Sequence, residues 1–202
     1  MLLAAGRGER MRPLTDTCPK PLLRVQGQSL LHYPLQALAR AGVSAVVINT
    51  GWLGDQIEPA FGTHFLHQDK TGDASTQMQL LYSHEGRGAG EALETAGGIV
   101  RALPLLDDVF WVAAGDVYVP GFAFSADSVA RFRASPQLAH IWLVPNPEHN
   151  PQGDFGLSAD GLALNLPRIA AQALFTFSTI ALYKRAFFEA DWCLIPMATP
   201  KV

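Results

Sequence analysis

Residues 1–23 gather the side chains that would be needed to bind an anion. A short apolar run leads into a loop with two glycines, and the charge that follows is positive: Arg7, Arg10, Arg12 and Lys20. Arginine offers a fork of N–H donors to phosphate oxygens, and lysine offers a compact point charge. Pro13, Pro19 and Pro21 fix φ along the segment, which holds the cations in defined positions. The pattern predicts a phosphate-binding loop.

A second interpretation of the same residues stays open at this point. Glycine and charge alone are equally typical of an ordinary strand-to-helix connection with a solvated basic face. A cleaved secretory signal is not expected. The apolar part before Gly6 is much shorter than the roughly 7–15 residues of a signal core, and the positive charge follows that part instead of preceding it.

Residues 83–98 form a second cluster of interest, in which five glycines stand beside Glu85, Glu94 and Thr95. Without further information, such a segment indicates a flexible loop that ends at a helix N-terminus, where Glu94 or Thr95 would act as a capping residue. Backbone at Gly97 and Gly98 could also approach a flat ligand, because no Cβ intervenes.

A single carboxylate, Asp116, follows the apolar run Val109–Ala113. Buried parallel strands end at a common edge of the sheet, so Asp116 is expected at the same edge as the first loop. Oxygen ligands of this kind hold hard cations such as Mg²⁺. A plain turn or capping role for Asp116 remains an alternative from the residues alone.

The elements that must position these residues alternate between strands and helices. Val43–Ile48 and Val109–Ala113 are continuous apolar runs, typical of strands buried on both faces. Residues 28–41 are predicted to form a helix, with Ser29 as N-cap and Gly42 as the stop. Residues 62–75 are expected to be irregular or an edge excursion. The alternation predicts an α/β fold.

Length and composition favour one domain, residues 1–202. The chain is 49% hydrophobic and 16% charged, without a run long enough to span a membrane. A net charge of −3 excludes an extended nucleic-acid-binding surface. We expect a cytoplasmic protein that does not bind membranes. The oligomeric state cannot be inferred from the sequence.

The motif LLAAGRGERMRPLT followed by PKPLL resembles the phosphate loop of the sugar-1-phosphate nucleotidyltransferases. The resemblance implies a Rossmann-like three-layer α/β/α sandwich with a mainly parallel central sheet, of the nucleotide-diphospho-sugar transferase type. It implies a nucleotide-binding half over about 1–120 and a sugar-binding half over about 121–202. It also implies that Arg12 and Lys20 are catalytic and that Asp116 binds Mg²⁺. The nucleotide-binding residues implied are Ala4, Ala5, Gly6, Arg7, Gly8, Glu85, Thr95, Gly97 and Gly98.

Residues 93–98 and the proline-rich segment 145–155 are similar to the branch of this family that acts on N-acetylmuramate 1-phosphate in peptidoglycan recycling. The resemblance implies UTP as the second substrate and places Asp154, Thr176 and Ser178 at the sugar. An enzyme for glucose or mannose 1-phosphate is the alternative within the family. A second metal-binding Asp is absent from its usual place near Met197–Pro200, so a non-catalytic nucleotide-sugar-binding subunit is the alternative of a different class.

Overall fold

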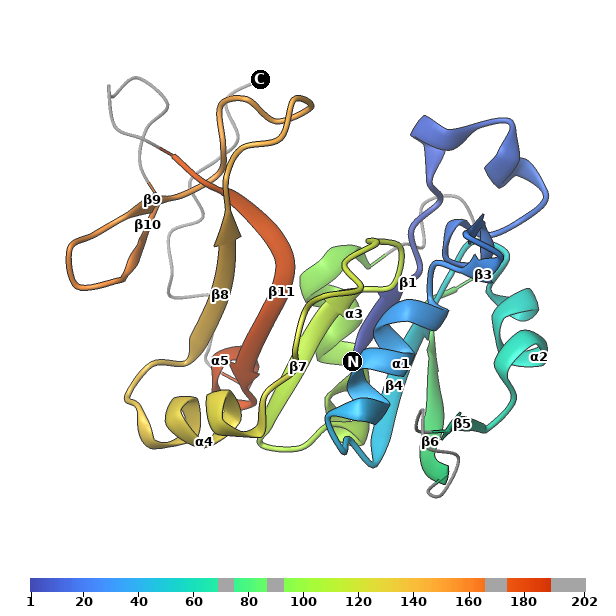
Figure 1. The fold of residues 1–202 in the computed structure, drawn as a ribbon, viewed down its shortest axis with the longest axis horizontal. Helices are drawn as coiled ribbons and strands as arrows, with labels where there is room; N and C mark the ends of the chain where they lie inside the picture. Colours follow the sequence, from blue (N-terminus) through green and yellow to red (C-terminus); the bar gives the residue numbers. More distant parts are fainter. Residues whose placement is uncertain (69–74, 87–92, 166–173, 190–202) are drawn as a thin grey trace.

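The computed structural model describes residues 1–68, 75–86, 93–165 and 174–189. Their centre is a seven-stranded sheet (Figure 1), in the spatial order β5 (His64–Gln68), β6 (Ser75–His84), β4 (Ala45–Thr50), β1 (Leu2–Ala4), β7 (Val109–Ala114), β11 (Thr176–Lys184) and β8 (Ala139–Val144). Strands β6, β4, β1 and β7 are parallel to one another, whereas β5 and β11 run antiparallel to their neighbours. The sheet is therefore mixed but mainly parallel, as the sequence predicts.

Helices and short hairpins complete the fold. The helices are α1 (His32–Arg40), α2 (Ile57–Phe61), α3 (Glu94–Ala102), α4 (Ala126–Ala134) and α5 (Ala186–Glu189). Short 3₁₀ turns cover Glu9–Met11, Leu14–Asp16, Lys20–Leu22, Gly54–Gln56 and Leu103–Leu105. Two small hairpins pair β2 (Arg24–Val25) with β3 (Gln28–Ser29), and β9 (Gly156–Leu157) with β10 (Ala163–Leu164).

Two hydrophobic clusters cover the two faces of the sheet. Successive residues of a strand point to opposite faces, so Val46 and Ile48 pack with α1 while Val47 packs with α3. The α1 side includes Leu31, Leu35 and Leu38, and the α3 side includes Ile99, Ala102 and Phe188 of α5. This is the three-layer α/β/α arrangement. The carboxyl ends of β1, β4, β6 and β7 meet at one edge of it, where Figure 1 shows the loop after β1.

The helix predicted over residues 28–41 begins later than expected. Gln28 and Ser29 form β3 of a hairpin, and α1 starts at His32, so Ser29 is not its N-cap. The turn of the hairpin places Gln26 and Gly27 at φ of 50° and 84°, the two positive values that a type I′ turn needs. The helix stop at Gly42 is confirmed, because that residue is left-handed at φ 77°.

The region predicted to be irregular, residues 62–75, contains the edge strand β5, which pairs antiparallel with β6. Residues Ala159–Gly161 lie in the connection of the hairpin formed by β9 and β10, where Gly161 is left-handed at φ 77°. In the described part of the chain, no helix has the length and apolar character needed to cross a membrane.

The half-buried His32 is expected to make the stability of the fold depend on pH. The His32 ring packs against Phe65, with ring centroids 5.2 Å apart. Burial, and then the nearby charge of His67, lowers the pKa of His32 from its ordinary value of 6.5. The native state therefore holds this ring neutral at pH values where the unfolded chain already binds a proton. Stability is unaffected well above pH 6.5 and falls as the pH drops from there toward the folded-state pKa.

We expect His32→Gln to show a smaller loss of stability than the wild type between about pH 7.5 and pH 5.5. Urea unfolding midpoints at the two pH values measure the difference. His149→Gln is the matched control, because that side chain is exposed. Equal losses in wild type and His32→Gln would show that this ring does not contribute.

Candidate active site

The loop after β1 folds back on the segment that carries Lys20. Gly8 is left-handed at φ 66°, and a Cβ added there would lie 3.1 Å from Lys20 Cβ and 3.1 Å from Thr15 Cγ2. The buried Thr15 donates its hydroxyl hydrogen to the Gly8 carbonyl at 3.0 Å. A side chain at Gly8 would force these groups apart, so the glycine allows the loop and Lys20 to pack together.

Lys20 and Asp116 meet at the edge of the sheet. Lys20 Nζ lies 2.7 Å from Asp116 Oδ2, and the side chains are 24% and 27% exposed. Asp116 follows β7, and Lys20 belongs to the segment that follows β1, the neighbouring strand. The sequence prediction that both lie at one edge is therefore correct. In the absence of ligands, the two residues predicted to bind phosphate and metal neutralise each other.

Arg7 and Arg12 point in different directions. The Arg7 guanidinium carbon lies 4.5 Å from the centre of the Trp52 ring, and Arg7 lines a cavity beside Asp116. Arg12 Nε donates to Asp16 Oδ1 at 2.7 Å, and the Arg12 side chain is 52% exposed. Arg12 is thus placed on the outer side of the loop, and its predicted role at the triphosphate stays a prediction.

The turn after β4 holds the phosphate loop in place. The Trp52 backbone N–H donates to the Ala5 carbonyl at 3.2 Å, and its indole N–H donates to the Thr15 carbonyl at 3.0 Å. Gly51 lies so close that an added Cβ would be 2.8 Å from the Ala5 oxygen. With Arg7 stacked on its ring, Trp52 contacts the loop at three points. The sequence analysis missed this residue.

We expect Trp52→Ala to raise the KM for the nucleotide about thirtyfold, since the loss combines a cation–π contact and a hydrogen bond of about 1 kcal/mol each. The kcat should change little, because Trp52 touches the loop and not the reacting atoms. Trp52→Phe keeps the ring and loses only the indole donor, so its KM should be intermediate. Initial rates with varied nucleotide measure this, and the KM for the second substrate is the internal control. An unchanged nucleotide KM in both variants would contradict the role.

The cavity beside Asp116 has a volume of about 460 Å³. On one side it is lined by Ala5, Gly6 and Arg7 of the loop and by Thr95 in the first turn of α3. A Cβ added to Gly6 would meet no atom within 4 Å, so the backbone there is open to a ligand. Loop, helix start and carboxylate therefore surround one space.

Glu85 lines this cavity but is itself held by the protein. Its side chain is 3% exposed and accepts hydrogen bonds from Asn49 Nδ2 and from the Leu93 backbone N–H. Asn49 Oδ1 in turn accepts from the Ala4 N–H at 2.7 Å. The group links the ends of β1, β4 and β6 to the start of α3. The role predicted for Glu85 in binding a nucleobase stays a prediction, because these bonds show only what holds the carboxylate.

Two glycines of α3 make room for this arrangement. A Cβ at Gly98 would collide with Glu85 Oε1, and a Cβ at Gly97 would lie 2.9 Å from Leu93 Cβ. Both glycines are therefore needed for packing, whatever they contribute to a ligand. Residues 87–92, which belong to the glycine-containing cluster 83–98 of the sequence analysis, lie outside the described residues.

The three residues predicted at the sugar make hydrogen bonds within the protein. Asp154 Oδ2 accepts from the Phe177 N–H at 2.8 Å, and Asn150 Nδ2 donates to Asp154 Oδ1 and to Thr176 Oγ1, each at 3.1 Å. These bonds fasten the loop 145–155 to β11, whereas Ser178 Oγ accepts from the Ile180 N–H of its own strand at 3.3 Å. None of these three described side chains lines the cavity beside Asp116, and their predicted role at the sugar stays a prediction.

The residues of β11 that do line the cavity are Phe177, Thr179 and Tyr183. The sequence analysis chose the polar residues Thr176 and Ser178 instead, whereas Phe177, Thr179 and Tyr183 occupy the alternate positions of the strand. The sequence did not show which face of β11 meets the cavity, because the pairing of β11 with β7 and β8 decides it.

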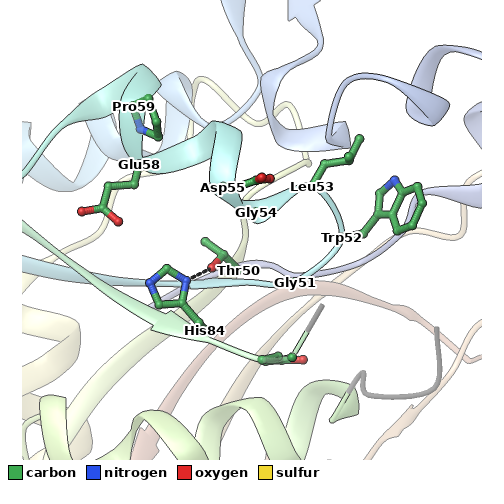
Figure 2. Close-up of a pocket in the computed structure, with 11 residues that line it drawn as sticks. Thr50, Gly51, Trp52, Leu53, Gly54, Asp55, Glu58, Pro59 and His84 are labelled. Carbon is green, nitrogen blue, oxygen red and sulfur yellow. Dashed lines mark hydrogen bonds between the residues drawn. The ribbon is translucent and has the colours of Figure 1, made fainter. Parts of the chain in front are cut away.

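A second hollow, of about 780 Å³, lies beside the ends of β4 and β6. Figure 2 shows its polar residues: Thr50 and His84, joined by a hydrogen bond of 2.7 Å, with Asp55 and Glu58 across from them. Three carboxylates line this hollow, those of Asp55, Glu58 and Glu85, and no Lys or Arg of the described residues lines it. Arg7 lines the cavity beside Asp116, so we expect an anionic ligand to prefer that cavity.

Asp116 fits a magnesium ion in part. Mg²⁺ is commonly held by one or two carboxylates together with phosphate oxygens of the substrate, so one exposed carboxylate at a phosphate site suits it. Within the described ranges, no group of three or more His, Cys, Asp or Glu residues could hold a metal. The region near Met197–Pro200, where the sequence analysis found no second metal-binding Asp, lies outside the described ranges.

A glycine-bearing loop with cations after the first strand, a carboxylate after the neighbouring strand and a cavity beside them are the features expected of a nucleotide-binding α/β protein. The comparisons with known proteins agree with this class. The family model described as nucleotidyl transferase matches residues 1–161. The chain belongs to this family.

Two named relatives lie in one branch of the family. The N-acetylmuramate alpha-1-phosphate uridylyltransferase of Neisseria meningitidis is 44% identical over 94% of this chain and 76% of the relative. The protein of the same name from Caulobacter vibrioides is 34% identical over 80% of this chain, which spans 65% of that relative. Among solved structures, the UTP-bound UGPase from Acinetobacter baumannii aligns with a TM-score of 0.70 over 93% of this chain and 74% of its own, at 17% identity. The last comparison confirms the fold alone.

Proposed function

We propose that this protein transfers a uridylyl group from UTP to N-acetylmuramic acid α-1-phosphate, giving the UDP-sugar and pyrophosphate. The contact between Lys20 and Asp116 carries the proposal, because it pairs a cation suited to phosphate with a carboxylate that is suited to a metal ion and lines the cavity. The names of the two muramate relatives support the choice of substrates.

In this reaction a phosphate oxygen of the sugar 1-phosphate attacks the α-phosphorus of UTP, and pyrophosphate leaves. Phosphoryl chemistry of this kind needs in-line positioning of the reactants and neutralisation of the phosphate charges more than it needs a protein nucleophile. The backbone at Ala5 and Gly6 and the Arg7 side chain would receive the nucleotide. Lys20 would lie between the attacking phosphate and the α-phosphate, and Arg12 would balance charge on the leaving pyrophosphate.

Asp116 is the residue that would hold Mg²⁺, which supplies positive charge to the α-phosphate and orients the leaving group. For Asp116 to bind a cation and Lys20 to bind phosphate, their 2.7 Å ion pair must separate. We infer that ligands replace the pair, with metal taking the place of the ammonium and phosphate taking the place of the carboxylate. Because the reaction consumes UTP, we place the protein in the cytoplasm, in the recycling of peptidoglycan sugars.

A panel of triphosphates against a panel of sugar 1-phosphates tests the proposal. UTP, dTTP and GTP would be combined with N-acetylmuramate, N-acetylglucosamine, glucose and mannose 1-phosphates, and pyrophosphate release would be measured. The highest kcat/KM is expected for UTP with N-acetylmuramate 1-phosphate. A preference for glucose or mannose 1-phosphate would support the alternative within the family. Binding of the UDP-sugar without exchange of labelled pyrophosphate would instead indicate a protein that only binds.

A further inference from the structure

Thr179, in the middle of β11, has a backbone conformation that threonine rarely adopts. Its φ is 65°, in the left-handed region, which is most unfavourable for a β-branched residue. The strand changes register here: along the ladder with β8, Phe177 pairs with Leu143 and the next pair is Ala181 with Ile141, so three residues of β11 lie opposite one residue of β8. Such bulges are frequent next to binding sites. Thr179 lies inside the bulge and lines the cavity.

The hydroxyl of Thr179 is also without a partner. Among the described residues, Thr179 Oγ1 is buried and makes no hydrogen bond. A buried hydroxyl left unpaired costs free energy, and native structures seldom retain one without a reason. Rotation about χ1 moves the hydroxyl to another staggered position. Because no hydrogen bond is broken by this rotation, Thr179 can present its hydroxyl to a ligand in the cavity.

The sheet order decides which half of the substrates this hydroxyl would meet. Strand β7, which leads to Asp116, lies between β1 with its phosphate loop and β11 with Thr179. Ile180 pairs with Ala113, so Thr179 lies across from the end of β7, close to Asp116 in the sheet. If the nucleotide lies over the end of β1 and the phosphates meet at Asp116, the space at β11 remains for the sugar.

We propose that Thr179 determines sugar specificity by donating or accepting a hydrogen bond with a polar substituent of the sugar ring, a hydroxyl or an acetamido group. The inference rests on the proposed function and deepens it. The strained backbone of Thr179 and its unpaired hydroxyl then have one common explanation, a contact that forms only when the sugar phosphate is bound. Thr179 is a contact residue for the sugar and takes no part in moving the phosphoryl group.

Three variants separate the hydroxyl from the backbone. Thr179→Val keeps the β-branched shape at the same φ and removes the hydroxyl, whereas Thr179→Ser keeps the hydroxyl. We expect Thr179→Val to raise the KM for N-acetylmuramate 1-phosphate about tenfold, the value of one hydrogen bond. Its KM for UTP should stay within about twofold of the wild type. Thr179→Ser should stay close to the wild type for both substrates. Thr179→Gly suits the left-handed backbone, so it should fold and still lose sugar affinity.

Calorimetry of the sugar 1-phosphate, with Mg²⁺ and a non-hydrolysable UTP analogue present, gives the same comparison without turnover. An unchanged sugar KM and Kd in both Thr179→Val and Thr179→Gly would overturn the inference, as would an equal rise in the KM for UTP. Absence of sugar-phosphate binding by the wild type would overturn it too. The wild-type panel tests the proposed function separately: uridylyl transfer by the wild type with no effect of Thr179→Val would leave the function standing and reject the role of Thr179.

Discussion

Replacing Lys20 by alanine is expected to lower kcat by about two to three orders of magnitude, the loss seen when a charge-stabilising group is removed from a transition state. Lys20 is held against Gly8 and lies 2.7 Å from Asp116, so no other side chain takes its place when it is truncated. Two phosphates must approach each other in the reaction, and their repulsion is greatest at the transition state. The effect should therefore fall on kcat more than on KM.

The measurement is pyrophosphate release with both substrates saturating. Arg40→Ala is the matched control, because it removes one positive charge from the exposed end of α1, away from the cavity. Loss of the Lys20–Asp116 pair should change the melting temperature little, since both side chains are about a quarter exposed and such pairs contribute modestly. Near-normal turnover by Lys20→Ala would show that Lys20 is not a catalytic residue.

Replacing Asp116 by asparagine is expected to raise steeply the Mg²⁺ concentration needed for half-maximal activity. Asparagine keeps one oxygen ligand and loses the negative charge that attracts the cation. The variant also loses the partner of Lys20, and the freed ammonium can then meet phosphate. In the absence of Mg²⁺, Asp116→Asn should thus bind UTP more tightly than the wild type, although it turns over more slowly.

Two titrations check the prediction, one of activity against Mg²⁺ and one of UTP binding with the metal chelated. Asp55→Asn is the control, because it removes a carboxylate from the neighbouring hollow of Figure 2 and not from the cavity. If the magnesium titration of Asp116→Asn matched that of the wild type, Asp116 would not be the metal ligand. If UTP binding without metal were no tighter, the ion pair would not compete with the ligand.

The central part of the fold could be predicted because its signals are local. The apolar runs of β4 and β7 have no other favourable place than the middle of a sheet, and parallel strands end at one edge. That argument alone predicted that Asp116 lies beside the loop of Lys20, although nearly half the chain separates the two residues in sequence. The start of α1 was wrong because Gln28 and Ser29 are compatible with a helix, and only their pairing with Arg24 and Val25 decides otherwise.

The inner wall of the site could not be predicted for a related reason. Thr176 and Ser178 were chosen as polar residues on a strand near the site, but the residues that line the cavity are Phe177, Thr179 and Tyr183 at the alternate positions. Which face of β11 meets the cavity depends on its pairing with β7 and β8, strands far apart in sequence. Glu85 presents a similar case, because its buried hydrogen bonds depend on Asn49 of another strand.

The sheet order has a consequence for how the protein is made. Strand β1 lies in the interior of the sheet between β4 and β7, whereas β11, which completes the cavity, comes more than sixty residues after β7. During synthesis the phosphate loop can therefore settle against its neighbours while the strand that carries Thr179 is still inside the ribosome. Pairing over such sequence separations is slow, and the exposed edge of β7 is open to wrong partners until β11 arrives. A ribosome-bound chain halted before residue 174 should consequently resist proteolysis around the loop and remain cleavable along β7.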